Sequence, residues 1–373
     1  MNQLLYLLPA LLFSCIRTDD TLEVHPEIKE CIEDARIENA LNSDTELIKL
    51  YADYRVEHEV SHHERETPER RKVFKKFLQQ VRNMKKNKLI TWKVGITPMA
   101  HLTDCEVALL HGANFTEQQN LASSQEFMMS LKAGGKPPKE WDWRTKGAVT
   151  PVQTQLGGTC WSHAAVVPIE AQIAKLRGFI REPEELSTQE LIDCAYEGKN
   201  RKLSDGGTQV NAWKYVKESK RLGFRSDIPD KMIVRSCSMI KRFGARNAIQ
   251  GFVLKDWYTI TLWEDDTNLL NIISTQSPVA IIMATKDVDL TTYKSGDYDW
   301  RVSGCKMGQF HAMSIVGYTE ERFIIKNSWG VTWGKKGYLH WLRTSPHGFS
   351  CNIYNTLHFP VMEKEEIDWE EFS

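Results

Sequence analysis

Cys160 is the residue of this sequence with the clearest capacity for nucleophilic chemistry. It lies in the stretch PVQTQLGGTCWSHAAV, residues 151–166, where a Gly-Gly-Thr turn meets a pattern that predicts a helix. A free cysteine is more often a small buried side chain than a nucleophile. A helix N-terminus, however, stabilises a thiolate because it presents free N–H groups and a partial positive charge. A base and an oxyanion donor elsewhere in the chain would favour the nucleophilic interpretation.

The chain offers a candidate for each of these roles. His311 lies in GQFHAMSIVGY at the start of a predicted strand, and Asn327 lies in IIKNSWG at the end of another apolar run. An asparagine amide oxygen can accept from one ring N–H of a histidine, which leaves the other ring nitrogen for the thiol. The NH₂ group of Gln155 could donate to an oxyanion together with the Cys160 backbone N–H. Each residue is usually structural when taken singly, and it is their combination that favours a thiol nucleophile.

The elements that must position these residues change in character along the chain. Residues 20 to about 120 are rich in charge, and TELIKLYADYRVEHEV and RRKVFKKFLQQVRNM have the spacing of amphipathic helices. LKAGGKPPKEWDW predicts a linker and a domain boundary near residues 134–139. Helix patterns then follow Cys160 and recur in STQELIDC and VNAWKYVKESKRLG, before the strand-like runs SPVAIIMA, HAMSIVGYT, RFIIKNSW and GYLHWLR. This order predicts an α+β fold in which a helical half packs against a sheet half.

The first residues predict a secretory signal peptide over residues 1–17. Residues 4–14 form an apolar run that is too short for a membrane span, although no Lys or Arg precedes it and no clear cleavage site follows. Secretion permits disulfides. The cysteines are at positions 15, 31, 105, 160, 194, 237, 305 and 351. Because Cys15 would leave with the signal, an odd number remains, so at least one thiol should be free or shared between chains.

Charge and motifs exclude several classes of function. The net charge of -1 offers no electrostatic footprint for nucleic acid or an anionic membrane. The basic stretch RRKVFKKFLQQVRNMKKNK is interpreted as the solvated face of an amphipathic helix. The chain has no CxxC or HExxH motif, so we expect neither a metal nor another cofactor.

From about residue 45 to residue 361 the chain resembles a papain-family cysteine protease precursor of the cathepsin L-like group. The segments that carry the resemblance follow in family order: WDWRTKGAVTPVQTQ, CWSHAAVVPIEAQ, LSTQELIDC, SDGG, SPVAIIMA, YKSGDYDW, HAMSIVGY and NSWGVTWGKKGY. The resemblance implies a propeptide over residues 18–137, with a helical inhibitor domain at about 45–105. It also implies a two-lobed peptidase domain over residues 138–362, with a helical lobe and a β-barrel-like lobe, and an acidic tail over residues 363–373.

The resemblance also implies roles for individual residues. Cys160 would be the nucleophile, His311 its ion-pair partner, Asn327 the residue that orients His311, and Gln155 an oxyanion donor. The residues that would bind substrate are Gly206, Gly207, Thr208, Gln209, Ile282, Ala312, Trp329, Trp333 and Thr356. In this set the two glycines would let a substrate backbone approach, Trp329 would cover the Asn–His hydrogen bond, and Trp333 would line the leaving-group side. Thr208, Gln209, Ile282, Ala312 and Thr356 would surround the substrate side chain two residues before the scissile bond.

Several positions depart from the family pattern. Gly157 and Ser204 stand where the family has a disulfide-bonded cysteine pair, and the loop between Gln155 and Cys160 is shorter, so we expect Gln155 to be less well braced. The resemblance implies that the remaining disulfides are Cys194–Cys237 and Cys305–Cys351, while Cys31 and Cys105 could pair in the propeptide. Pro168 interrupts the nucleophile helix, where an interior proline is unfavourable. His163 replaces an aromatic residue near Cys160 and is interpreted as a packing side chain.

The upstream region matches the family's inhibitory propeptide in part. Glu66, Arg70, Phe74 and Val81 fall in register with its helical motif, whereas Phe77 and Lys85 replace two asparagines. In GITPMAH, Thr97, Met99 and His101 replace the usual Asn, Phe and Asp. The resemblance implies a propeptide that lies across the cleft as an inhibitor and is released by acid. Asn114, in the sequence NFT, is a glycosylation sequon.

These observations predict a monomeric secreted or lysosomal cysteine endopeptidase, made as a zymogen, that cleaves protein or peptide substrates through a Cys160 thioacyl-enzyme with His311 as acid and base. No insertion with paired histidines separates Cys194 from Cys237, which favours an endopeptidase. The alternative is a catalytically impaired papain-like domain that acts as a binding or regulatory protein, which the shortened loop, Pro168 and the altered propeptide motifs would favour.

Overall fold

The computed structural model describes residues 26–60, 67–114, 135–196, 201–231, 233–243, 248–260, 266–284, 287–305, 310–343, 351, 353 and 357–365. The chain divides into two compact units, Met1–Leu50 and Tyr51–Ser373. The described part of the first unit contains α2 (Pro26–Asn42) and the beginning of α3 (Asp44–Glu57). The second unit holds everything that positions the candidate site.

The second unit begins with a small helical region. It contains the end of α3, α4 (Pro68–Lys86), β1 (Lys93–Val94), the 3-10 helix η1 (Pro98–His101) and α5 (Asp104–Leu109). The apolar face of α4 is buried at the spacing that the sequence predicted, through Phe74, Phe77, Leu78 and Val81. The Phe74 ring packs between Tyr51 and Tyr54, with both centroid distances 5.0 Å.

A bidentate ion pair joins α4 to α5. Arg70 donates from both terminal nitrogens to the Glu106 carboxylate, at 2.5 Å each, and from Nη1 to the His101 carbonyl oxygen at 3.0 Å. The hydrogen bonds from Arg70 lower the pKa of Glu106 to about 2, against the opposing effect of burial. Glu106 also accepts from the backbone N–H of Thr103, which caps α5. The pair therefore fixes the first turn of α5 against α4.

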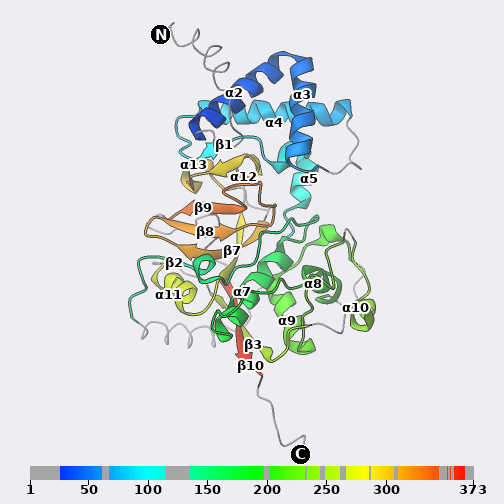
Figure 1. Cartoon of the computed structure of the whole chain (residues 1–373), viewed down its shortest axis with the longest axis vertical. Helices are drawn as coiled ribbons and strands as arrows, with labels where there is room; N and C mark the ends of the chain where they lie inside the picture. The colour runs from blue at the N-terminus through cyan, green and yellow to red at the C-terminus, as the bar shows by residue number, and fades with distance from the viewer. Residues whose placement is uncertain are drawn as a thin grey trace, which may run out of the picture. The chain divides into compact units, whose positions relative to one another are not determined.

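The helical half of the remaining chain is built around α7 (Cys160–Leu176), which is buried over nearly its whole length. Figure 1 shows α7 beside the sheet, with α8 (Thr188–Cys194) and α9 (Gln209–Ser219) on its other side. One hydrophobic cluster joins α7, α8 and α9 to β4 and β7. The disulfide Cys194–Cys237 ties α8 to α10 (Cys237–Phe243).

Pro168 lies inside α7 without ending it. A proline has no N–H to donate to the carbonyl four residues earlier, which here is that of Ala164. Ser314 Oγ donates to this oxygen at 3.0 Å, and Trp213 Nε1 donates to the next carbonyl, that of Ala165, at 3.0 Å. Tertiary partners thus satisfy the carbonyl that Pro168 leaves without a helical donor.

The sheet half is a mixed eight-stranded sheet with the order β3-β10-β4-β7-β8-β9-β6, with β2 paired to β7 off this path. All pairs are antiparallel except β6 with β9. The strands are β2 (Trp141–Asp142), β3 (Phe252–Ile260), β4 (Val279–Ala284), β6 (Asp297–Tyr298), β7 (Phe310–Tyr318), β8 (Arg322–Lys326), β9 (Tyr338–Leu342) and β10 (Leu357–Lys364). A separate two-stranded sheet pairs β1 with β5 (Tyr293–Ser295).

Short elements complete the described chain. They are η2 (Trp143–Lys146), η3 (Leu203–Asp205), α11 (Thr267–Thr275), α12 (Asp287–Thr291) and α13 (Trp300–Ser303). Helices first and strands later, packed on each other, confirm the predicted α+β class.

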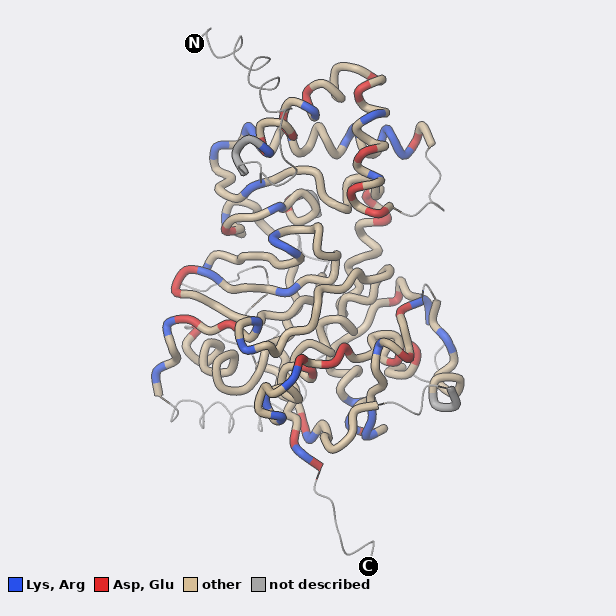
Figure 2. Tube along the Cα trace, viewed as in Figure 1, with Lys and Arg blue, Asp and Glu red and all other residues tan. Residues whose placement is uncertain are grey.

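Figure 2 shows Lys and Arg close to Asp and Glu along most of the trace, in keeping with the near-neutral net charge. Across the described helices, none has both the length and the apolar character needed to cross a bilayer.

Candidate active site

His311 and Asn327 meet because β7 and β8 are antiparallel neighbours. His311 is the second residue of β7, and Asn327 directly follows β8. His311 Nε2 lies 2.7 Å from Asn327 Oδ1, so Nε2 carries the proton and donates it to the amide oxygen. The Trp329 ring covers the imidazole, with centroids 4.8 Å apart. The hydrogen bond leaves Nδ1 as the ring nitrogen that can act as a base.

Cys160 lies beside His311. It is the first residue of α7 and packs in one buried cluster with Ala312, the residue after His311. Burial raises the pKa of the Cys160 thiol to about 11, although the N–H groups of Ala312, Gly112 and Trp161 favour the thiolate. Burial also lowers the pKa of His311 to about 4. In this covered state both groups are therefore neutral at pH 7.

Gln155 is held firmly although the loop before Cys160 is short. Its backbone N–H donates to the Ser328 carbonyl oxygen at 2.7 Å, and its side-chain Oε1 accepts from Ser328 Oγ at 2.8 Å. These bonds fix which end of the amide faces the site, so that Nε2 points inward. Ser328 supplies the bracing that we expected to be lost with the disulfide.

The segment Leu110–Asn114, which follows α5, covers these residues. Gln155 Nε2 donates to the Leu110 carbonyl oxygen at 2.9 Å. The same carbonyl favours the charged form of His311, although no well-formed hydrogen bond joins it to Nδ1 among the described residues. The His111 ring stands edge-on to His311, with centroids 5.6 Å apart. The Leu110 carbonyl oxygen thus accepts from Gln155 Nε2, the donor that we expect to stabilise the oxyanion.

Backbone hydrogen bonds hold the segment against Gly207. The Gly207 N–H donates to the Gly112 carbonyl oxygen and the Asn114 N–H donates to the Gly207 carbonyl oxygen, both at 2.8 Å. A Cβ added to Gly112 would overlap the Gly158 carbonyl, and one added to Gly207 would overlap the Trp161 ring. Glycine is therefore required on both sides of this contact.

Sequence reasoning missed this covering segment. Leu110, His111 and Gly112 lie in LLHGAN, which matches no motif, and only the tertiary contacts identify them. It did single out Asn114, which is exposed and donates from Nδ2 to the Asp205 carbonyl oxygen at 3.0 Å.

The structure places the expected substrate-binding residues in different environments. Ile282 and Ala312 face each other across β4 and β7, in one cluster with Ala113 of the covering segment. Thr208 caps α9, and Gln209 is completely buried. Trp333 is also buried, 5.2 Å from Trp329 between ring centroids, and its Nε1 donates to the Leu290 carbonyl. Thr356 lies outside the described residues, as do Glu66 of the propeptide motif and the remainder of the sequon after Asn114.

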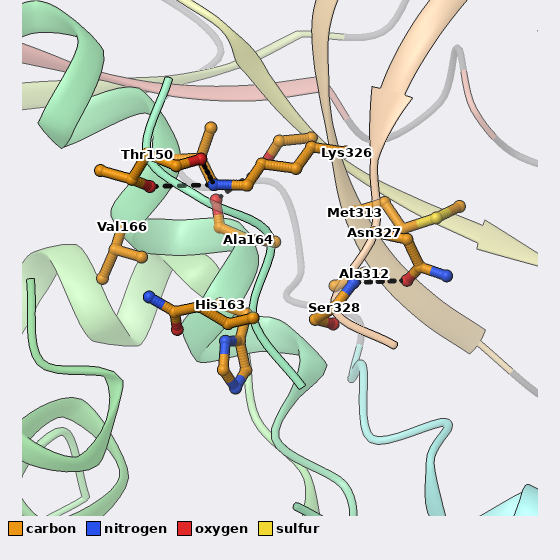
Figure 3. A pocket seen from close by; sticks show the side chains of 12 residues that line it. Thr150, His163, Ala164, Val166, Ala312, Met313, Lys326, Asn327 and Ser328 are labelled. Carbon is orange, nitrogen blue, oxygen red and sulfur yellow. Dashed lines mark hydrogen bonds between the residues drawn. The ribbon is translucent and has the colours of Figure 1, made fainter. Parts of the chain in front are cut away.

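A cavity with about 20 Å³ of space for water-sized spheres lies behind the Asn327 side of the site. Lys326 Nζ donates to the Thr150 carbonyl oxygen at 2.8 Å, and Thr150 Oγ1 donates to Glu170 at 2.7 Å. His163 lines the same cavity, and burial lowers its pKa to about 4. Figure 3 shows its ring pointing away from Asn327. This arrangement agrees with a packing role for His163.

The two expected disulfides of the peptidase region are formed, but the possible pairing of Cys31 with Cys105 is not, because both are free thiols. The bonds Cys194–Cys237 and Cys305–Cys351 are both present, while Cys31, Cys105 and Cys160 are free thiols. Among the described residues, no group of His, Cys, Asp or Glu has the arrangement of a metal site.

The geometry can be compared with known proteins. The family model described as "Papain family cysteine protease" matches residues 137–361. The chain belongs to the papain family. This assignment confirms the resemblance that the motifs predicted, and the protein is a cysteine-type peptidase.

Relatives and solved structures extend the match into the upstream region. Mexicain from Jacaratia mexicana is 31% identical over 226 residues, which are 60% of this chain and 98% of mexicain. Cathepsin L1 from Drosophila melanogaster is 28% identical over 286 residues, 73% of each chain. The proform of the ragweed pollen cysteine protease Amb a 11 has a TM-score of 0.72 at 26% identity, covering 88% of this chain and 98% of its own. The digestive procathepsin L 3 of Tenebrio molitor has the same fold, with a TM-score of 0.68 at 23% identity, covering 84% of this chain and 99% of its own. Because these structures include their proregions, this papain-family chain is a zymogen with a propeptide.

Proposed function

We propose that this zymogen is an endopeptidase of the secretory pathway, lysosomal or extracellular, that hydrolyses peptide bonds through a thioacyl-enzyme on Cys160. The observation that carries the proposal is the hydrogen bond from Gln155 Nε2 to the Leu110 carbonyl, the same carbonyl that favours the charged form of His311. A peptide carbonyl of a substrate would take the position that Leu110 occupies here. Processing of the propeptide near residues 130–140 would open the site.

The proposed reaction has two stages, acylation of Cys160 and hydrolysis of the thioester. His311 Nδ1 takes the thiol proton, and the Cys160 thiolate attacks the peptide carbonyl carbon. Gln155 Nε2 and the Cys160 backbone N–H donate to the oxyanion. The His311 imidazolium then gives its proton to the leaving amine as the carbon–nitrogen bond breaks. Water, with His311 as base, attacks the thioester and releases the acid and the free thiol. Asn327 holds the imidazole in the required tautomer throughout.

The propeptide supports latency in two ways. It occupies the oxyanion position with the Leu110 carbonyl, and it buries Cys160 and His311. Burial disfavours charged groups, so a thiolate–imidazolium pair is less stable under the propeptide than in an open site. We infer that release of the propeptide both clears the cleft and permits the ion pair.

The alternative of an impaired binding domain gains no support from the shortened loop or from Pro168, two of the three features that suggested it. Ser328 braces Gln155, and α7 continues through Pro168. Both features leave the catalytic residues together.

The pH dependence of Cys160 alkylation by iodoacetamide tests the proposal. We expect slow labelling of the full-length zymogen and fast labelling of the acid-processed protein at about pH 5, well below the thiol reference pKa of about 8.5. A processed His311→Ala variant should lose the fast labelling at low pH. If processed wild-type protein and variant instead both react only as the pH approaches the reference value, no ion pair forms and the endopeptidase proposal fails.

A further inference from the structure

Asn114 is the exposed end of the covering segment. Gly112 and Ala113, which precede it, are buried, whereas Asn114 itself is exposed. It opens the sequence Asn-Phe-Thr, residues 114–116, and no other Asn-x-Ser or Asn-x-Thr sequon occurs in the chain. In a protein of the secretory pathway such a sequon is an acceptor for N-linked oligosaccharide. A sequon alone does not tell whether its asparagine lies at the surface of the folded chain, and here the asparagine does.

The hydrogen bonds of Asn114 leave one N–H of its side chain unused. Its backbone N–H donates to the Gly207 carbonyl oxygen at 2.8 Å, and its Nδ2 donates to the Asp205 carbonyl oxygen at 3.0 Å. A side-chain amide has two N–H bonds, and the described residues accept from only one of them. N-glycosylation replaces one N–H by a bond to a sugar and keeps the other. A glycosylated Asn114 can therefore retain both hydrogen bonds that hold it.

The surface around this amide is open to solvent. Ser204 and Asp205, in the 3-10 helix that Asn114 contacts, are exposed. A glycan is bulky and hydrophilic, so it requires a solvated neighbourhood. One residue earlier, Ala113 packs in the same buried cluster as Ala312. The covering segment thus emerges into solvent where the sequon begins.

We propose that Asn114 carries an N-linked glycan in the zymogen and that activation removes it, so that the mature peptidase has none. This inference rests on the proposed entry into the secretory pathway. In the transfer, Asn114 Nδ2 forms a bond to the anomeric carbon of a lipid-linked oligosaccharide diphosphate. The bond from that carbon to the diphosphate oxygen breaks, the lipid diphosphate leaves, and the nitrogen gives one proton to a base of the transferring enzyme.

The position of the sequon restricts the glycan to the precursor. Processing near residues 130–140 would separate Asn114 from the peptidase domain, and residues 138–373 contain no sequon. A carbohydrate-binding receptor of the secretory pathway would therefore hold the zymogen and not the mature enzyme. Any sorting that depends on the sugar would have to precede activation.

Enzymatic deglycosylation of the full-length chain, expressed with its own N-terminal segment in insect cells, tests the inference. Peptide N-glycosidase F should raise the electrophoretic mobility of the secreted zymogen by the size of one glycan, and mass spectrometry should find Asn114 converted to aspartate. The peptidase domain after acid processing should show no shift. Thr116→Ala destroys the sequon without changing Asn114 and should abolish the shift, whereas the matched control Thr116→Ser keeps the sequon and should keep the shift.

A second readout tests where the glycan stands. Because the glycosylated amide keeps its bond to the Asp205 carbonyl, the covering segment should stay in place. The glycosylated wild-type zymogen and the unglycosylated Thr116→Ala zymogen should therefore be equally latent at pH 7. Higher activity of the glycosylated zymogen would show that the sugar displaces the covering segment, and would contradict this placement.

The outcomes separate this inference from the proposed function. A secreted zymogen without a shift overturns the glycan and leaves the endopeptidase proposal intact. A shift that persists in Thr116→Ala, or that occurs in the acid-processed peptidase domain, assigns the sugar to another residue and also overturns the inference. A chain that stays in the cytosol contradicts the secretory part of the proposed function, and the inference falls with it.

Discussion

The propeptide region contacts the peptidase domain at two places whose chemistry differs. At the first, Leu110–Asn114 binds through backbone hydrogen bonds and glycine packing next to Cys160. At the second, β1 pairs with β5, the Trp92 ring packs on Tyr298 at 4.7 Å, and Lys294 Nζ donates to the Ile96 carbonyl oxygen at 2.9 Å.

Titratable side chains gather at the second contact. His58 Nδ1 lies 3.3 Å from Thr332 Oγ1, and Lys294 and His101 lie close enough to disfavour its charged form. His101 in turn lies 2.6 Å from the Tyr54 hydroxyl. We infer from this difference that the first contact blocks the nucleophile, while the second contact is the one whose stability depends on pH.

The largest expected effect concerns Gln155, which serves the substrate and the propeptide with the same NH₂ group. In processed protein, Gln155→Ala should lower kcat by about 10²–10³-fold, the usual cost of removing one oxyanion donor. Gln153→Ala, which removes an amide two residues away that donates to Glu185, is the matched control and should change kcat little. Latency of the full-length Gln155→Ala chain should persist, because the Gly207 bonds to the covering segment remain. Unaltered kcat in Gln155→Ala would show that this amide does not stabilise the oxyanion.

The next effect concerns Gly112, on which the first contact depends. Gly112→Ala places a methyl group against the Gly158 carbonyl and should push the covering segment out of the cleft. We expect the activity of the unprocessed chain at pH 7 to rise at least about tenfold, since a displaced carbonyl no longer fills the oxyanion position. Leu109→Ala, at a half-exposed neighbouring position, serves as control. If the Gly112→Ala chain stays fully latent, the second contact suffices for inhibition, and inhibition cannot be assigned to the first contact.

The smallest effect concerns His58 at the second contact. Its pKa is lowered to about 4, chiefly by burial, against the opposing effect of Glu57 and with smaller lowering contributions from Lys294 and His101. A base whose pKa is lower when docked favours docking fully above its free value of about 6.5, and this contribution is lost as the pH falls towards 4. His58→Gln removes the contribution, so we expect acid activation to need a lower pH, with latency at pH 7 unchanged.

Activation rates measured between about pH 6 and pH 4 check this expectation. Activation of His58→Gln with the wild-type pH profile would assign the acid response to other groups. Glu106 is the next candidate, because its ion pair with Arg70 is complete above the ordinary pKa of 4.5 and is lost only as the pH falls towards 2. The two residues would thus act in different pH ranges.

The sequence by itself identified the candidate catalytic set. The nucleophile required the start of a helix, and Cys160 follows a Gly-Gly-Thr turn. The base and its orienting amide required the beginning of one strand and the end of the next, and His311 and Asn327 occupy those positions. Local patterns reveal such positions because the starts and ends of helices and strands have recognisable sequence signals. The departures from the family pattern were also visible in the sequence, although their consequences were not.

Tertiary structure alone decided how those departures are tolerated. Ser314 satisfies the carbonyl that Pro168 leaves open, Ser328 braces Gln155 in place of a disulfide, and the glycine of LLHGAN closes over Cys160. Each of these contacts joins residues that are far apart in the sequence. Although Ser314 and Ser328 lie in segments that carry the family resemblance, no local pattern predicts which residue each of them contacts. The exposure of Asn114 is of the same kind, because only the packed chain shows whether the asparagine of a sequon lies at the surface. Hydrogen bonds between distant segments depend on how the helical and sheet halves pack, and a local pattern carries no information about that packing.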